Sequence, residues 1–136
     1  DYGHHPNEIK KMLSVISSLA KHKRGKAYVF FQPHKYTRTK AFWSEFIKIF
    51  SYEGIFKSFI TDVYAAGDDY DPVYNSENLV SRLRENKIDS EYIPFDSKYR
   101  GLIRKLNEIE CRLNSNDVIL CLGAGTLDQF AKLIVN

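Results

Sequence analysis

Short apolar segments alternate with longer amphipathic segments along this chain, and that alternation limits the possible folds more than any other feature. After an opening amphipathic segment, runs that predict strands cover residues 26–31, 56–64, 90–95 and 117–125. Segments with helical spacing follow them at 39–53, 76–87, 98–113 and 126–136. Parallel strands are joined by helices, and right-handed crossovers place those helices on both faces. The sequence therefore predicts an α/β fold: a Rossmann-like doubly wound, mainly parallel sheet with helices on both faces.

The opening helix can be predicted in more detail. Pro6 suits a first helical turn, and helical spacing predicts an apolar face of Ile9, Met12, Leu13, Ile16 and Leu19. The basic run "KHKRGK" at 21–26 is typical of a helix C-terminus, and we expect Gly25 to cap it. The alternative is a patch of cations that contacts phosphate.

Several expectations concern the other elements. Residues 39–53 predict one helix, which buries Phe42, Phe46, Ile49 and Phe50. Ser76 is the expected cap of the next helix, and Gly101 is expected to interrupt the helix at 98–113. Pro94 favours an edge position for the strand at 90–95. The strands at 26–31 and 117–125 are expected to be adjacent and central.

Composition bounds the class of protein. A chain of 136 residues with 43% hydrophobic residues suggests one soluble domain, residues 1–136. A net charge of +3 is too small to indicate a nucleic-acid partner, and no apolar run approaches the roughly 20 residues that span a bilayer. No secretory signal is expected at the N-terminus. Two cysteines, Cys111 and Cys121, indicate no disulfide framework, which favours a reducing, cytoplasmic compartment.

The loop "QPHKYTRT" at 32–39 is the densest cluster of polar side chains. His34, Lys35, Thr37 and Arg38 lie between a strand and a helix. Ligands of doubly wound sheets bind beyond the carboxyl ends of the strands, and cations at a helix N-terminus favour anions. The loop is therefore a candidate anion site; the alternative is a polar loop whose charges are solvated.

The turn "GAGT" at 123–126 is a weaker candidate. Glycines at a strand-to-helix turn allow close approach by a ligand or by another part of the backbone. It is no dinucleotide fingerprint, because Asp128 occupies the third glycine position. A phosphate-binding P-loop is absent: the only Gly-Lys pair, Gly25-Lys26, has Ala27 after it. The four histidines lack the spacing of metal ligands, so no metal site is predicted.

Four motifs together are more specific than any of these features. "DYGHHPNEIK", "FFQPHKYTRT", "TDVYAAG" and "ILCLGAGT" occur in this order. In sequence and separation they resemble the C-terminal domain of the Mur ligases, over the whole chain. The resemblance is strongest to the branch that joins L-alanine to UDP-N-acetylmuramate.

The resemblance implies a cytoplasmic, bacterial, ATP-dependent ligase of peptidoglycan precursor synthesis. ATP would phosphorylate the muramoyl carboxylate, and the amine of L-alanine would attack the acyl phosphate. The N-terminal domain, which holds the UDP sugar, and the central domain, with the P-loop and Mg²⁺ ligands, would be this chain's partners. This domain would close over ATP, bind neither ATP nor Mg²⁺ tightly alone, and contribute no catalytic residue. The fragment is therefore expected to be inactive.

The resemblance also implies roles for individual residues. Asp1 would accept hydrogen bonds from the ATP ribose, and Gly123, Ala124, Gly125 and Thr126 would lie on the nucleotide side. Tyr2 and His4 would line the L-alanine site, and Arg38 would hold the alanine carboxylate. Lys35 stands where the family usually has a second arginine, which keeps the charge and loses the planar fork. Thr126 replaces the usual Asp or Asn.

Two other interpretations stay open. One is the related ligase that recycles cell-wall peptides by attaching a whole peptide to UDP-N-acetylmuramate. The other is a non-catalytic doubly wound binding module. A P-loop in the coding sequence upstream would exclude the second.

Overall fold

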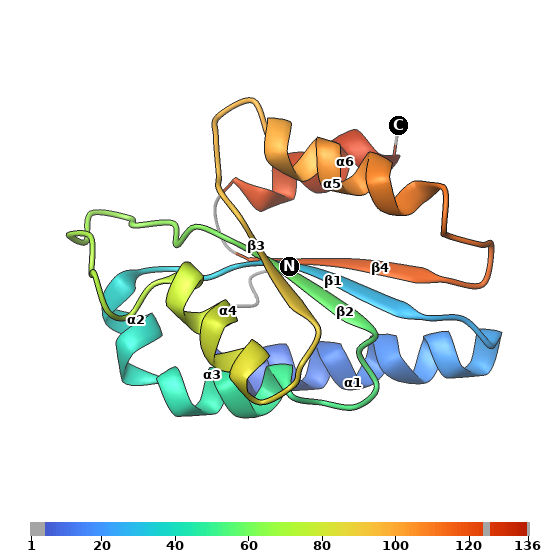
Figure 1. The fold of residues 1–136 in the computed structure, drawn as a ribbon, viewed down its shortest axis with the longest axis horizontal. Coiled ribbons are helices and arrows are strands. Elements are labelled where there is room, and N and C mark those ends of the chain that lie inside the picture. Colours follow the sequence, from blue (N-terminus) through green and yellow to red (C-terminus); the bar gives the residue numbers. More distant parts are fainter. Residues whose placement is uncertain (1–4, 124–125, 136) are drawn as a thin grey trace.

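The computed structural model describes residues 5–123 and 126–135, and they form a sheet covered by helices on both faces (Figure 1). The strands are β1 (Ala27–Gln32), β2 (Lys57–Thr61), β3 (Ser90–Ile93) and β4 (Val118–Gly123). The helices are α1 (Pro6–Lys23), α2 (Tyr36–Ala41), α3 (Trp43–Phe50), α4 (Ser76–Glu85), α5 (Arg100–Glu110) and α6 (Leu127–Val135). None of the described helices is both long enough and apolar enough to cross a membrane.

All strand pairs are parallel, and the order is β3-β2-β1-β4. The predicted adjacency of the strands at 26–31 and 117–125 is confirmed, since Ala27–Gln32 pair in register with Val118–Gly123. The central position predicted for the strand at 117–125 is wrong, because β4 has one neighbour among the described strands and lies at the edge of the sheet. The chain returns from β3 to the far side of β1, so the strand order reverses between β1 and β4. Ligands of such sheets bind at this switch point.

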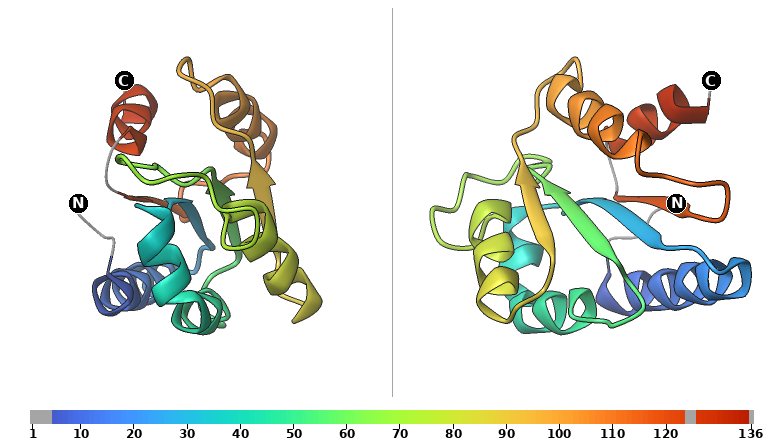
Figure 2. Two further views of the ribbon diagram at one scale, coloured as in Figure 1. Left: turned by 90° about the vertical axis from the view of Figure 1, so that its left-hand side faces the viewer. Right: turned by 45° about the vertical axis from the view of Figure 1, so that its right-hand side comes forward.

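The helices divide between the two faces of the sheet (Figure 2). Alternate strand residues point to opposite faces, so Val29 and Phe31 face α1, α3 and α4, whereas Tyr28 and Phe30 face α5 and α6. Both cores are aromatic-rich, with Phe31 against Phe46 and Phe50 on one side and Phe30 against Phe59 and Phe130 on the other. The predicted fold class is confirmed.

The predicted single helix at 39–53 is wrong. Phe42, with φ −113° and ψ 25°, separates α2 from α3. Phe46, Ile49 and Phe50 are buried as expected, whereas Phe42 is half-buried with its ring edge-on to His5 at 5.0 Å. On α1, Leu19 is 46% exposed, and Ala20 takes the buried position in its place.

The predicted helix caps need correction. Arg24, not Gly25, takes the left-handed conformation that ends α1, with φ 58° and ψ 35°. Asn75, not Ser76, caps α4, because its side-chain oxygen accepts a hydrogen bond from the Asn78 amide at 2.9 Å. Gly101 does not interrupt α5, since it is the second helical residue, where the backbone amide needs no partner within the helix.

Gly25 is required by a close approach instead. A Cβ built on it would lie 1.8 Å from the backbone oxygen of Asn116, in the turn before β4. We expect Gly25→Ala to lower the free energy of unfolding by about 1–3 kcal/mol, because the backbone must move to make room. Gly67→Ala is the comparison: Gly67 has open space and φ +94°, so only conformational strain of about 1–2 kcal/mol applies. Denaturant titration measures both, and a neutral Gly25→Ala would contradict the close approach.

Candidate functional site

The loops that follow the strands meet at the carboxyl edge of the sheet, as the sequence predicted. The turn after β1 is hydrogen bonded to the segment after β2 in both directions. The Lys35 amide donates to the Tyr64 carbonyl at 2.8 Å, and the Tyr64 amide donates to the Pro33 carbonyl at 2.8 Å. These bonds extend the β1–β2 pairing beyond the strands and hold the "QPHKYTRT" loop in place.

Lys35 has an unusual backbone conformation. Its φ of 67° and ψ of 134° are rare for a residue with a side chain and cost on the order of 1–3 kcal/mol. The Lys35 carbonyl accepts hydrogen bonds from the amide and the hydroxyl of Thr39, at 3.1 and 2.8 Å. Contacts on both sides of the residue therefore maintain the strain, which fixes the direction in which the chain enters α2.

Arg38 is positioned by a histidine. Its guanidinium nitrogen lies 2.8 Å from Nδ1 of His34, one helical turn earlier. A guanidinium only donates, so Nδ1 accepts and the imidazole is neutral with its proton on Nε2. The His34 ring also stacks on Tyr64, with ring centroids 5.7 Å apart.

Neither Lys35 nor Arg38 forms a salt bridge with any acid in the part of the chain that the structure describes. The imidazole of His34 orients the Arg38 guanidinium without forming an ion pair with it, and no acid among the described residues pairs with this guanidinium. The turn after β1 thus presents two half-buried cations at the carboxyl edge of the sheet. That arrangement suits a small carboxylate or another anion.

Asp68 ties the long loop after β2 to the start of α2. Its carboxylate accepts hydrogen bonds from the amide and the hydroxyl of Thr37, at 2.9 and 2.8 Å. These bonds, with a smaller contribution from the charge of Lys35, hold the pKa of Asp68 below its ordinary value. Asp68 is therefore an anchor for the loop, and its Oδ2 accepts both of these hydrogen bonds.

Gln32, the last residue of β1, connects the ends of both neighbouring strands. It is 2% exposed. Its Nε2 donates to the Asp62 carbonyl after β2 at 3.3 Å, and its Oε1 accepts from the Thr126 hydroxyl after β4 at 3.2 Å. The register pairs Gln32 with Gly123, which has φ +151°. A Cβ there would lie 2.7 Å from the Gln32 carbonyl oxygen, so glycine is required at the end of β4.

A second group of contacts joins the ends of β2, β3 and β4. The Asp62 carboxylate accepts hydrogen bonds from the Tyr92 hydroxyl and from the Phe95 amide. Burial and the hydrogen bond to Asp62 raise the pKa of Tyr92, so its hydroxyl remains a donor. The Tyr99 hydroxyl donates to the Thr126 carbonyl at 3.1 Å, which fixes the start of α6 from the side of α5.

The predicted site residues fall into two groups. Lys35 and Arg38 lie in the turn after β1, while Gly123 and Thr126 lie at the end of the adjacent strand β4. The structure thus brings these four to one edge at the switch point. Asp1, Tyr2, His4, Ala124 and Gly125 lie outside the described residues.

Sequence reasoning missed the residues that connect these groups: Gln32, Asp62, Asp68, Tyr92 and Tyr99. A signal existed only for Gln32, since a polar residue that ends an otherwise apolar strand needs a partner when it is buried. The other four make contacts over long sequence separations that the residue pattern does not encode.

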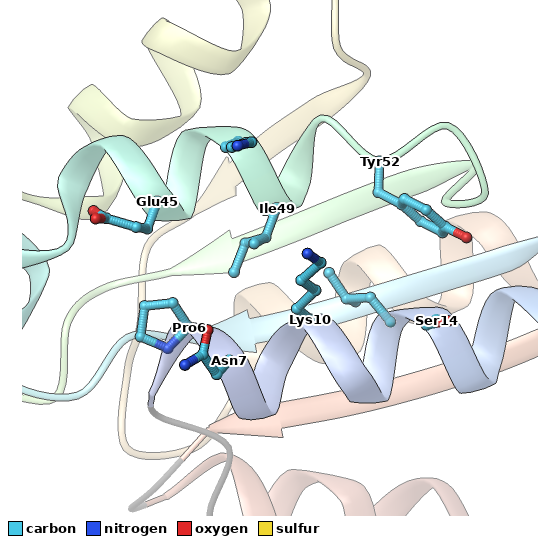
Figure 3. Close-up of a pocket in the computed structure, with 9 residues that line it drawn as sticks. Pro6, Asn7, Lys10, Ser14, Glu45, Ile49 and Tyr52 are labelled. Atoms are coloured by element: carbon cyan, nitrogen blue, oxygen red, sulfur yellow. The ribbon is translucent and has the colours of Figure 1, made fainter.

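A groove of about 400 Å³ lies elsewhere, between α1 and α3 (Figure 3). Leu13, Ile49 and Pro6 give it an apolar floor, and Lys10 and Glu45 lie on opposite walls. It contains none of the predicted site residues. Nearby His5 caps α1 by accepting a hydrogen bond from the Asn7 amide at 3.2 Å, so its imidazole has a structural role.

The described residues offer no place for a metal ion: no three His, Cys, Asp or Glu side chains among them cluster suitably. If a magnesium ion takes part in the chemistry, the described part of this chain supplies no such set of ligands.

Comparisons with known proteins agree on one group. The chain matches no family model. It is 35% identical over 138 residues to the UDP-N-acetylmuramate–L-alanine ligase of Wigglesworthia glossinidia brevipalpis, covering 100% of the chain and 27% of that protein. The protein of the same name from Prochlorococcus marinus is 36% identical over 139 residues, and that from Rickettsia felis 32% over 132 residues. Each of these two matches covers 97% of the chain, and 27% and 26% of the respective relative.

Proposed function

Since the chain belongs to the Mur ligase family, with the features of a C-terminal domain of UDP-N-acetylmuramate–L-alanine ligases, we propose that it positions L-alanine and closes over ATP in such an enzyme. The chain spans about a quarter of the length of the relatives it matches. We assign the rest of the enzyme, with the UDP-sugar site, the P-loop and the Mg²⁺ ligands, to other domains of the same protein. These domains are the partners of residues 1–136, which act as a single domain in a bacterial cytoplasm.

The observation that carries this proposal is the pair of cations beyond β1, Lys35 and Arg38, neither of which forms a salt bridge with an acid among residues 5–123 and 126–135. L-alanine offers a carboxylate that must be held and an amine that must stay free to attack. Arg38, oriented by the neutral His34, would donate to the carboxylate, and Lys35 would add charge without the planar fork of an arginine. Tyr2 and His4 would complete this side of the site.

Orienting the amine is the contribution of this domain to the reaction. The muramoyl carboxyl is activated by phosphorylation from ATP, and the amine of L-alanine attacks the acyl phosphate with loss of phosphate. Holding the amino acid in a reactive position lowers such a barrier by several kcal/mol, on the order of the gain from a well-oriented intramolecular reaction. No residue of this chain needs to transfer a proton or form a covalent bond.

The nucleotide side is assigned to the end of β4. Gly123 ends β4 and Thr126 immediately precedes α6, so in the proposal the nucleotide contacts the strand-to-helix turn between them. In the proposal, Ala124 and Gly125 belong to the same surface, and the Asp1 carboxylate accepts hydrogen bonds from the ribose hydroxyls. No triphosphate-binding loop is needed in this chain if the central domain supplies it.

Steady-state assays of the longer protein test the proposal. We expect release of phosphate from ATP only when UDP-N-acetylmuramate and L-alanine are both present. Turnover with a tripeptide and not with L-alanine would instead identify the recycling ligase. Absence of turnover with either acceptor would favour a non-catalytic binding module. Of the alternatives, the names of the relatives favour the L-alanine ligase.

A further inference from the structure

Gln32 is placed to affect both halves of the proposed site, the L-alanine side and the nucleotide side. Its amide acts through other residues of the chain, Asp62 and Thr126. It immediately precedes the turn that carries Lys35 and Arg38, and it pairs in register with Gly123. Its side chain is buried, and both ends of its amide are hydrogen bonded to loops of neighbouring strands. A buried amide is tolerated where its polar atoms find partners.

The two ends of the amide support different loops. Nε2 donates to the Asp62 carbonyl, two residues before Tyr64, whose backbone holds Lys35 and Pro33. Oε1 accepts from the Thr126 hydroxyl, at the turn assigned to the nucleotide. One side chain therefore braces the amino-acid side through Asp62 and the nucleotide side through Thr126.

We infer that Gln32 is a positioning residue that keeps the L-alanine and ATP halves of the site in register. The inference rests on the proposed function, because it takes the two halves from it. An apolar side chain of the same length would fill the space and break both hydrogen bonds. The loops would then lose a shared brace, and both substrates would bind more weakly.

The test compares Gln32→Met with a matched control in the full-length enzyme. Gln129→Met makes the same change at an exposed position of α6 and should leave every KM unchanged. We expect Gln32→Met to raise the KM for ATP and for L-alanine each by about two- to ten-fold, the loss of a neutral hydrogen bond at each end. The KM for UDP-N-acetylmuramate should stay within the error of the measurement.

Variants at Thr126 test the Oε1 end of the Gln32 amide separately from the Nε2 end. Thr126→Val removes the hydroxyl that Oε1 accepts from, so it should raise the KM for ATP alone, whereas Thr126→Ser keeps the hydroxyl and should restore it. In the double variant Gln32→Met/Thr126→Val, the effect on ATP should equal that of Gln32→Met rather than add to it. Thr126→Val and Thr126→Ser still test the Oε1 end of the amide if Gln32→Met does not fold.

The outcomes distinguish the inference from the function on which it rests. If the unmodified enzyme shows no turnover dependent on L-alanine, the proposed function fails. If it turns over, and Gln32→Met lowers only kcat through loss of folded enzyme, Gln32 is structural and the inference is wrong. An unchanged KM for ATP in Thr126→Val, or additive effects in the double variant, would also overturn it.

Discussion

Arg38→Ala in the full-length enzyme is expected to raise the KM for L-alanine about ten- to a hundred-fold, the loss of a charge-assisted hydrogen bond. The KM values for ATP and the UDP sugar should be nearly unchanged. The reason is local: the guanidinium is oriented by His34 and has no acidic partner among the described residues, so removing it breaks no described ion pair. Steady-state kinetics with each substrate varied in turn measure the three constants.

Three further variants make the result specific. Arg38→Lys should recover only part of the affinity, because a point charge replaces a planar fork. Lys35→Arg should tighten L-alanine binding or leave it unchanged. Lys40→Ala removes an exposed cation from the same helix, close to the Tyr74 ring, and should leave the KM for L-alanine unaltered. A uniform loss of affinity for all three substrates in Arg38→Ala, with a lower melting temperature, would show that Arg38 only anchors its own loop.

The sequence predicted the architecture well because hydrophobic periodicity is a strong signal. Residues 27–31 are apolar throughout, as strands buried on both faces must be, and the structure places β1 at Ala27–Gln32. The adjacency of β1 and β4 followed from the need to bring two polar turns together. The edge position of β4 did not, because a fully apolar strand is equally suited to a central position.

Local geometry was harder to predict because several residues can satisfy one rule. Gly25 and Arg24 both lie at the end of α1, and the chain uses Gly25 for its close approach to Asn116, which leaves the left-handed conformation to Arg24. Asn75 and Ser76 are both good caps. The structure uses Asn75, so Ser76 is the first helical residue instead of the cap. Such choices depend on tertiary contacts that sequence spacing does not contain.

In the candidate site too, some residues could be predicted from the sequence and others depend on tertiary contacts. Lys35 and Arg38 could be selected from sequence because they are cations directly after a strand. The bond from Thr126 to Gln32 joins residues 94 positions apart, and that from Tyr92 to Asp62 joins residues 30 apart. A single sequence carries no information on such pairs until the strand order is known.

The chain on its own is expected to have no measurable ligase or ATPase activity, and to bind ATP at best in the millimolar range. The lone Gly-Lys pair cannot act as a phosphate loop, since it lies at the amino ends of the strands, opposite the proposed site. There the Lys26 amide donates to Asp117 at 2.8 Å, and its Nζ lies 4.2 Å from the centroid of the Phe56 ring. The proposed site leaves only contacts to the ribose and adenine side of ATP.

A millimolar dissociation constant corresponds to about −4 kcal/mol, which a few such contacts can supply. Calorimetry with ATP on the isolated chain, and a phosphate-release assay with all three substrates, measure the two quantities. Micromolar binding of ATP would reveal a triphosphate site within these residues, and the division of labour proposed for the domains would then be wrong. Turnover that appears only when the full-length protein is used would support that division, because phosphate binding and amino-acid positioning would then reside on separate parts of one chain.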